Sequence, residues 1–125
     1  TYNRTMPLIY SGQEEPVLRP LAFFEKDPIE FGKYQRAAFY SSLLHLRKNN
    51  TAFADNASFK RLWVDHPAQV MAYERTNGND KVIVSGTDLK EGYQELFSKE
   101  LVKDIHQLQL PAWGYKVYVK KGVKK

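Results

Sequence analysis

The sequence predicts a mainly β fold, in which a strand–loop–helix unit precedes an antiparallel β-sandwich. Three observations predict it. Residues 7–50 contain one short apolar run and one stretch with helical periodicity, whereas residues 51–125 contain five or six short strand-like runs. The later runs are separated by turn residues, as in an antiparallel sandwich. Because the pattern changes near residue 50, we assign two domains, 1–50 and 51–125.

The first domain is expected to hold a buried strand, a long loop and one helix. Residues 7–10, Pro-Leu-Ile-Tyr, form a short apolar run that turns polar at Ser-Gly, so we predict a buried strand and then a loop over residues 11–27. Asp27-Pro28 is typical of a helix start, with Asp at the cap and Pro in the first turn. Gly32 weakens that turn. The regular helix is therefore expected over residues 33–49.

The second domain is expected to form the sheet. Residues 59–64 are strand-like, and residues 70–84 indicate a hairpin around the sequence Thr-Asn-Gly-Asn-Asp. Three further strands are predicted over residues 93–97, 106–110 and 115–119. In the last of these, apolar and polar residues alternate, which indicates one buried face.

Composition excludes several classes of function. The chain has no Cys, so it contains neither a disulfide nor a thiolate metal site. The net charge of +5 comes largely from a lysine-rich end, which we interpret as a solvated tail rather than a nucleic-acid interface. No apolar run approaches the roughly 20 residues of a membrane span. His45, His66 and His106 are too far apart in sequence to indicate a metal site.

Four segments of the chain carry a family resemblance. They are Pro7-Leu-Ile-Tyr-Ser-Gly-Gln-Glu14, Leu21-Ala-Phe-Phe-Glu-Lys-Asp-Pro-Ile29, the helical run from Phe39 to Asn50, and Leu110-Pro-Ala-Trp-Gly-Tyr-Lys-Val-Tyr118. In this order they resemble the C-terminal region of the α-amylase family of glycoside hydrolases. The resemblance implies the last strand, loop and helix of a (β/α)8 catalytic barrel, followed by the β-sandwich called domain C in that family.

The resemblance also implies a function and its partners. The chain would be the non-catalytic end of an enzyme that acts on α-glucans such as starch and maltooligosaccharides. It would pack against the upstream barrel of the same polypeptide, and it would be inactive alone because the catalytic carboxylates lie on earlier barrel strands. No cofactor is expected in these residues, and a calcium site in the parent enzyme would use upstream ligands.

The loop after the first strand carries the candidate substrate-binding residues. If the chain ends a barrel, this loop lies at the catalytic rim, where Glu14 and Arg19 would hydrogen-bond to sugar hydroxyls. An ion pair within the loop is the alternative that we favour for them. We assign no catalytic residue, because the adjacent Glu14 and Glu15 would point to different sides of an extended chain and Asp27 is better explained as a helix cap.

Two other functions stay open, a stand-alone carbohydrate-binding module and an interaction module without sugar chemistry. A carbohydrate-binding module needs aromatic side chains exposed in a row on one sheet face. We predict instead that Trp63 and Trp113 pack in the core, because Trp buries much apolar area. We also expect residues 1–30 to be poorly ordered, to fold back onto the sandwich or to pair with another copy, because residues 7–10 would lack strand neighbours. Neither nucleic acid nor a membrane is expected as a partner.

Overall fold

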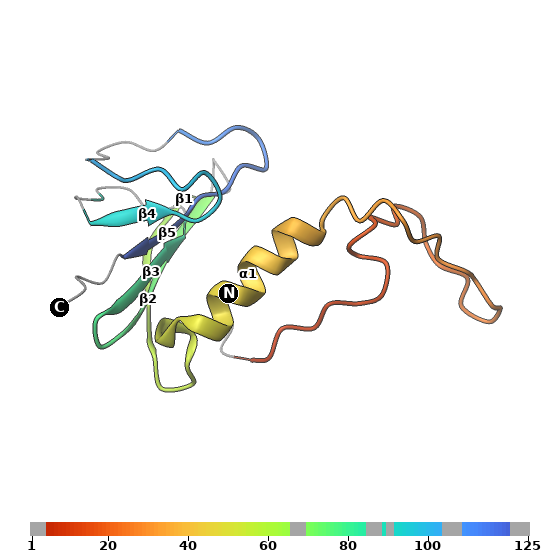
Figure 1. Cartoon of the computed structure of the whole chain (residues 1–125), viewed down its shortest axis with the longest axis horizontal. Coiled ribbons are helices and arrows are strands. Elements are labelled where there is room, and N and C mark those ends of the chain that lie inside the picture. The colour runs from red at the N-terminus through yellow and green to blue at the C-terminus, as the bar shows by residue number, and fades with distance from the viewer. Residues whose placement is uncertain (1–4, 66–69, 85–88, 90–91, 104–108, 121–125) are drawn as a thin grey trace.

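The computed structural model describes residues 5–65, 70–84, 89, 92–103 and 109–120. These residues form a mainly β fold with one α-helix and a single five-stranded antiparallel sheet (Figure 1). The helix α1 spans Ala37–Asn49 and is followed by a 3-10 turn, η1, over Thr51–Phe53. The strands are β1 Ser58–Asp65, β2 Val70–Asn77, β3 Asp80–Val84, β4 Tyr93–Glu95 and β5 Val117–Lys120.

The sheet follows the order β1-β2-β3-β5-β4, and every neighbouring pair is antiparallel. The predicted hairpin is confirmed: β2 and β3 pair from Tyr73 with Val84 to Asn77 with Asp80, around a turn at Gly78 with φ of 55°. The strand predicted over 59–64 is confirmed, and those over 93–97 and 115–119 are confirmed in part. The strand predicted over 106–110 lies largely outside the described residues, and residues 109–110 belong to no strand.

Two apolar clusters cover opposite faces of the sheet. On one face α1 and η1 pack against β3 and β5, through Leu46, Ala52, Phe53, Val82 and Val117. On the other face lie Ile83, Leu89, Val102 and Tyr118. The described residues therefore form one sheet covered by a helix on one side and by a loop segment on the other, and the second sheet of the predicted sandwich is not among them.

Two buried charged side chains attach loops to the sheet. Arg75 of β2 is fully buried, and it donates from Nε to the Ala52 carbonyl at 2.9 Å and from Nη2 to the Ala54 carbonyl at 3.3 Å. Its guanidinium carbon lies 5.4 Å from the centre of the Phe53 ring, within the range of a cation–π contact. Glu95 of β4 is also buried and accepts hydrogen bonds from backbone N–H groups of the turn that follows it. Arg75 thus fixes η1 beneath α1.

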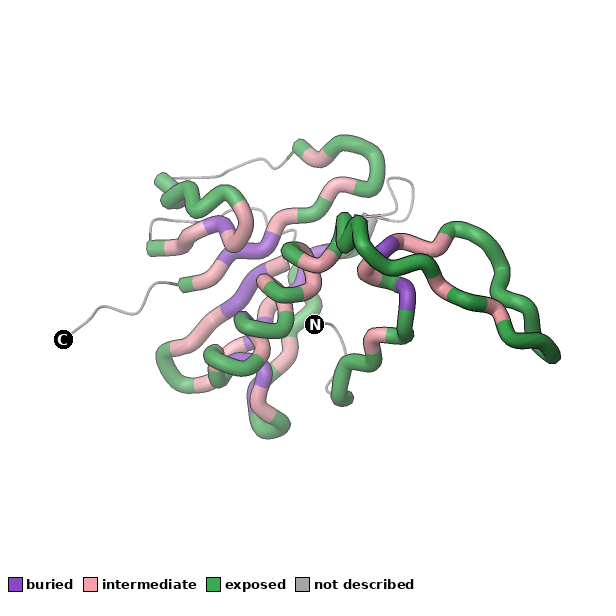
Figure 2. Tube along the Cα trace, turned by 45° about the vertical axis from the view of Figure 1, so that its right-hand side comes forward, coloured by how far each residue is buried: buried purple, intermediate pink, exposed green. Residues whose placement is uncertain are grey.

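The predicted buried strand at residues 7–10 is wrong. Among the described residues this segment pairs with no strand, and Leu8 is 86% exposed. An isolated strand is unstable because it needs neighbours for its backbone hydrogen bonds and a face to bury. Figure 2 shows residues 5–10 and most of the loop after them as exposed chain, away from the sheet.

The predicted start of the helix at Asp27, or at residue 33 for its regular part, is also wrong. The helix α1 begins at Ala37. Gly32 and Tyr34 have positive φ values of 141° and 48°, which a right-handed helix cannot contain. The Asp27 carboxylate binds Arg19 and caps no helix. The predicted end of the helix at Asn49 is confirmed.

Candidate functional site

The candidate site is the loop over residues 11–36, which carries the residues that the sequence proposed for substrate binding. This loop projects beyond the N-terminal end of α1, away from the sheet (Figure 1). Three acidic side chains hold it in shape, and each uses a different set of donors. The chemistry available to a ligand therefore depends on which polar groups these internal contacts leave exposed.

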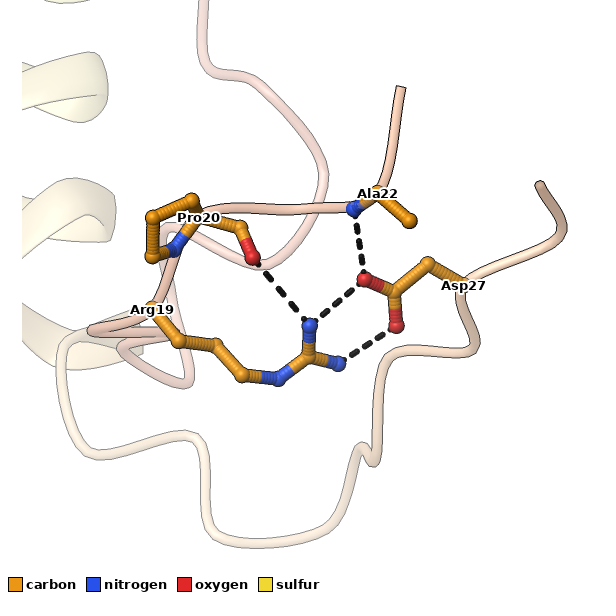
Figure 3. Close-up of polar contacts among 4 residues, drawn as sticks. All are labelled: Arg19, Pro20, Ala22 and Asp27. Carbon is orange, nitrogen blue, oxygen red and sulfur yellow. Dashed lines mark hydrogen bonds and ion pairs between the residues drawn. The ribbon is translucent and has the colours of Figure 1, made fainter. Parts of the chain in front are cut away.

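Arg19 and Asp27 form a bidentate ion pair that closes the loop (Figure 3). The two terminal nitrogens of Arg19 each donate to one Asp27 oxygen at 2.5 Å. Asp27 also accepts a hydrogen bond of 2.8 Å from the Ala22 backbone N–H. The Arg19 hydrogen bonds, together with the one from Ala22, lower the pKa of the Asp27 carboxyl to about 2. The ion pair that we favoured over sugar binding for Arg19 is therefore present.

The chain between the two members of this ion pair forms an exposed tip, and we call residues 20–26 the aromatic tongue. Phe23 and Phe24 are 89% and 93% exposed. Their rings stack edge to face, with centroids 4.8 Å apart. Glu25 and Lys26 complete the tip, so the tongue carries one acidic and one basic side chain beside its two aromatic rings.

Glu15 anchors the second half of the loop. Its Oε1 accepts from the Gly32 N–H at 2.8 Å, and its Oε2 accepts from the N–H groups of Lys33 and Tyr34 at 3.2 Å each. Successive N–H groups that point to one side form an anion-binding nest, and here a carboxylate of the same chain occupies it. Burial raises the pKa of the Glu15 carboxyl, but these three hydrogen bonds outweigh that effect and hold the pKa below its ordinary value. Glu15 is thus a structural anion.

Glu14 lies beside this anchor but does not join Arg19. Its Oε2 accepts from the Gly12 N–H at 3.1 Å, and its carbonyl accepts from the Arg36 N–H at 3.0 Å. Among the described contacts none connects the Glu14 and Arg19 side chains. The two residues predicted to bind substrate therefore lie in one loop but are held by separate contacts.

An open groove of about 680 Å³ runs along this loop, between residues 15–19 and residues 28–33. Its lining includes both charged and apolar side chains, among them Arg19, Glu30 and Phe31. A groove with hydrogen-bonding groups beside an aromatic ring suits a ligand that is polar at its edges and flat on its faces, as a sugar ring is.

A second groove, of about 610 Å³, lies at the other end of α1, and we call it the helix-end groove. Its apolar lining includes Met6, Pro7 and Leu44. The basic residues of the last turn of α1, Arg47 and Lys48, also line it, together with polar residues over 49–51. The groove therefore combines apolar, polar and cationic side chains.

The prediction that Trp63 and Trp113 pack in the core is wrong. Trp63 is 44% exposed on β1, at the edge of the sheet, and Trp113 is 99% exposed with φ of 61°. The apolar clusters centre on β3 and β5, so the described elements leave the β1 edge and the turn before β5 uncovered. The two rings form no row on one sheet face, because Trp113 lies outside any strand and β2 and β3 separate β1 from β5.

Sequence reasoning missed the role of Glu15, and one signal could have indicated it. Gly32 takes a φ value open only to glycine, and such a residue allows the N–H groups after it to turn toward one anion.

Within the described ranges, no group of three His, Cys, Asp or Glu side chains could hold a metal ion. No helix of the described chain has the length and apolar character needed to cross a bilayer.

Comparison of the chain with protein-family models and with curated proteins finds no match.

Proposed function

We propose that this chain is the non-catalytic C-terminal part of an α-amylase-like glycoside hydrolase acting on α-glucans. Residues 1–50 would complete the catalytic barrel, and residues 51–125 would form the β-domain that packs against it. The four segments that resemble this family suggest the proposal. The structural observation that carries it is the distribution of exposed apolar side chains.

Exposed apolar side chains are concentrated in the first part of the chain. Among the described residues, nine of the seventeen large hydrophobic residues that are exposed lie within residues 5–36: Met6, Leu8, Tyr10, Leu18, Leu21, Phe23, Phe24, Phe31 and Tyr34. So many exposed apolar side chains within one segment favour a protein contact over a surface made for water. Packing of residues 5–36 against the rest of a barrel would cover it.

The acidic side chains of the loop fit a supporting role and not a catalytic one. Glycoside hydrolysis needs two carboxyl groups that flank the bond, one acting as acid and the other as nucleophile or base. Both oxygens of Glu15 and both oxygens of Asp27 already accept hydrogen bonds within the loop. In the proposed enzyme the catalytic pair therefore comes from upstream barrel strands.

Arg19 is the residue of the loop best placed to contact a sugar. Its side chain is 55% exposed, and three of its hydrogen bonds are to Asp27 and the Pro20 carbonyl. A guanidinium has five N–H donors, so others can point to a hydroxyl group. Glu14 is half-buried next to Gly12 and lies outside the lining of the groove, so it would accept a hydrogen bond only from a sugar that extends beyond the groove.

The reading frame upstream of the Thr1 codon tests the proposal first. We expect about 300 or more preceding residues, enough for the rest of a barrel, with acidic residues on predicted strands four, five and seven. The full-length protein should release reducing ends from maltooligosaccharides or starch, whereas the 125-residue chain should release none. A frame that begins close to Thr1, or a full-length protein without action on α-glucans, would overturn the proposal.

Substitutions in the full-length enzyme test the contacts with sugar. Removing a contact that binds substrate and transition state equally raises KM and leaves kcat unchanged. Arg19→Gln and Glu14→Gln are expected to raise KM for maltooligosaccharides about tenfold, the scale of one hydrogen bond to a charged group. Arg36→Gln is the matched control for Arg19→Gln, because Arg36 is an exposed arginine of the same loop and, unlike Arg19, does not line the groove. If all three variants have the same KM as the wild type, sugar binding by Glu14 and Arg19 is excluded.

A second candidate is a carbohydrate-binding module, in which exposed rings stack on sugar. Trp63 and Trp113 meet the requirement of exposure, although they form no row on one sheet face. Affinity electrophoresis of the 125-residue chain through gels containing soluble starch tests it. Retardation that Trp63→Ala or Trp113→Ala abolishes would support this function. Migration equal to that in a gel without starch would exclude it.

A further inference from the structure

We infer that the 125-residue chain forms a dimer in which the aromatic tongue of each copy inserts into the helix-end groove of the other. The inference goes beyond the proposed function and does not rest on it, because it concerns how two surfaces of this chain fit each other. It also defines which part of residues 1–30 takes part in self-association.

The tongue is preorganised for insertion. Its base is closed by the bidentate ion pair between Arg19 and Asp27 and by the hydrogen bond from the Ala22 N–H. Phe23 and Phe24 pack against each other at its tip and are almost fully exposed. Aromatic side chains held in this way act as anchors in protein interfaces, because little conformational entropy is lost when they are buried.

The helix-end groove offers what the tongue needs. Its apolar lining includes the exposed side chains of Met6 and Leu44, which provide a surface for the two rings. Arg47 and Lys48 at the groove provide positive charge for Glu25, which directly follows Phe24.

A tongue cannot reach the groove of its own molecule. The tongue lies beyond the N-terminal end of α1 (Figure 1). The groove lies at its C-terminal end, because its lining includes residues 47–49 of the last turn. The 13 residues of α1 alone span about 20 Å. The contact is therefore between copies, and a two-fold axis that pairs each tongue with the other groove closes the assembly as a dimer.

The chemistry of the tip favours a protein groove over a lipid surface. Peripheral attachment to anionic membranes uses clusters of basic residues, whereas the tip has one acidic and one basic side chain. Four buried Phe rings would remove about 600–1,000 Å² of surface from water. This is at or below the lower end of specific interfaces, so the dimer is expected to be weak and to depend on concentration.

Sedimentation equilibrium of the 125-residue chain over a wide concentration range tests the inference. We expect a monomer–dimer equilibrium that the double variant F23S/F24S weakens about tenfold or more, as the loss of an interface anchor does. Leu18→Ser is the matched control, since Leu18 is 84% exposed in the same loop but outside the tongue. This control should dimerise like the wild type. Circular dichroism should be unchanged in all variants, because the residues changed lie outside the apolar clusters.

A charge exchange tests the orientation of the contact. Glu25→Lys alone and the double variant R47E/K48E alone should each weaken dimerisation about threefold to tenfold, and the two together should restore it. Glu100→Lys, which changes the same charge at an exposed residue outside the tongue and both grooves, should have no effect.

Three results would overturn the inference. They are a monomer at every concentration, a dimer that F23S/F24S leaves unchanged, and binding to vesicles of phosphatidylcholine and phosphatidylserine that requires the tongue while the protein stays monomeric. None of them depends on α-glucan hydrolysis by the full-length protein, so failure here is distinguishable from failure of the proposed function.

Discussion

Arg19 and Asp27 bind each other through two parallel hydrogen bonds of 2.5 Å, one to each oxygen of the carboxylate. This geometry uses the planar fork of the guanidinium, which a lysine could not reproduce. It removes Asp27 from the role of helix cap and separates the tongue from the rest of the loop. The two residues therefore control both the shape of the candidate site and the presentation of Phe23 and Phe24.

Loss of Arg19 should be visible in the titration of Asp27. Its carboxyl has a pKa of about 2, below the ordinary value of about 3.9, mainly because of the hydrogen bonds from Arg19. Because the pKa of the Asp27 carboxyl is lower in the folded chain than in the unfolded chain, the ion pair stabilises the loop fully above about pH 4. This stabilisation is lost as the pH falls through about 2. In Arg19→Gln, the Asp27 pKa should rise toward its ordinary value.

Carbon-13 NMR of the side-chain carboxyl carbons measures this pKa directly. Arg36→Gln serves as the control, because Arg36 is exposed and makes no ion pair among the described contacts. An Asp27 pKa that stays near 2 in Arg19→Gln would show that the ion pair does not form in solution.

Glu15 should protect three backbone amides from hydrogen exchange. Its carboxylate accepts from the N–H groups of Gly32, Lys33 and Tyr34, which precede α1 and belong to no helix. The variant Glu15→Ala removes the acceptor, so these amides should exchange about tenfold or more faster, consistent with the loss of hydrogen bonds to a charged group.

The neighbouring residue gives a matched control. The Glu14 carboxylate accepts only from the Gly12 N–H among the described contacts. Glu14→Ala should therefore leave the exchange rates of residues 32–34 as in the wild type. If those three amides are equally protected in Glu15→Ala and in the wild type, Glu15 does not accept their hydrogen bonds in solution.

Local sequence signals predicted the second half of the chain better than the first. The hairpin over β2 and β3 was predictable because alternating side chains and an Asn-Gly turn act within a few residues. The strand expected at residues 7–10 was not, because a strand exists only where neighbours complete its hydrogen bonds, and a single run of sequence does not contain them.

The candidate site shows the same limit in its side chains. Asp27-Pro28 is a valid helix start by local chemistry, but Arg19, eight residues earlier, competes for the same carboxylate. Trp63 was expected in the core from its size alone, yet burial depends on what covers the edge strand. The sequence predicted that Arg19 forms an ion pair within the loop, but it did not identify Asp27 as the partner.

Arg75 should be the charged residue to which stability is most sensitive. Replacement by Ala leaves a cavity beside Phe53 and removes donors from the carbonyls of Ala52 and Ala54. A buried carbonyl without a donor costs about 1–3 kcal/mol, so Arg75→Ala is expected to lower the free energy of unfolding by about 3–5 kcal/mol. Urea denaturation followed by circular dichroism measures this change.

Arg61 on β1 provides the control for Arg75. It is exposed on the neighbouring strand, and Arg61→Ala should change the free energy of unfolding by about 0.5 kcal/mol or less. Similar effects of the two substitutions would show that Arg75 is not buried in solution.

Glu95 should make stability depend on acid pH. It is buried, and its Oε2 accepts from the N–H groups of Phe97 at 2.9 Å and Ser98 at 2.6 Å, while its Oε1 accepts from that of Val117 at 3.4 Å. Burial raises the pKa of this carboxyl, but the hydrogen bonds from Ser98, Val117 and Phe97 outweigh burial and hold the pKa below its ordinary value.

The contribution of Glu95 is therefore fully present above its unfolded pKa of about 4.3 and is lost as the pH falls through its lower folded value. At neutral pH, Glu95→Gln places an amide NH₂ against N–H donors and should lower the free energy of unfolding by about 1–3 kcal/mol. Below about pH 4 the gap between variant and wild type should narrow, because the wild-type carboxyl becomes protonated. Urea denaturation across this pH range measures both effects, with Glu100→Gln in the same turn as the exposed control. A gap that stays constant with pH would mean that the Glu95 charge contributes nothing to the fold.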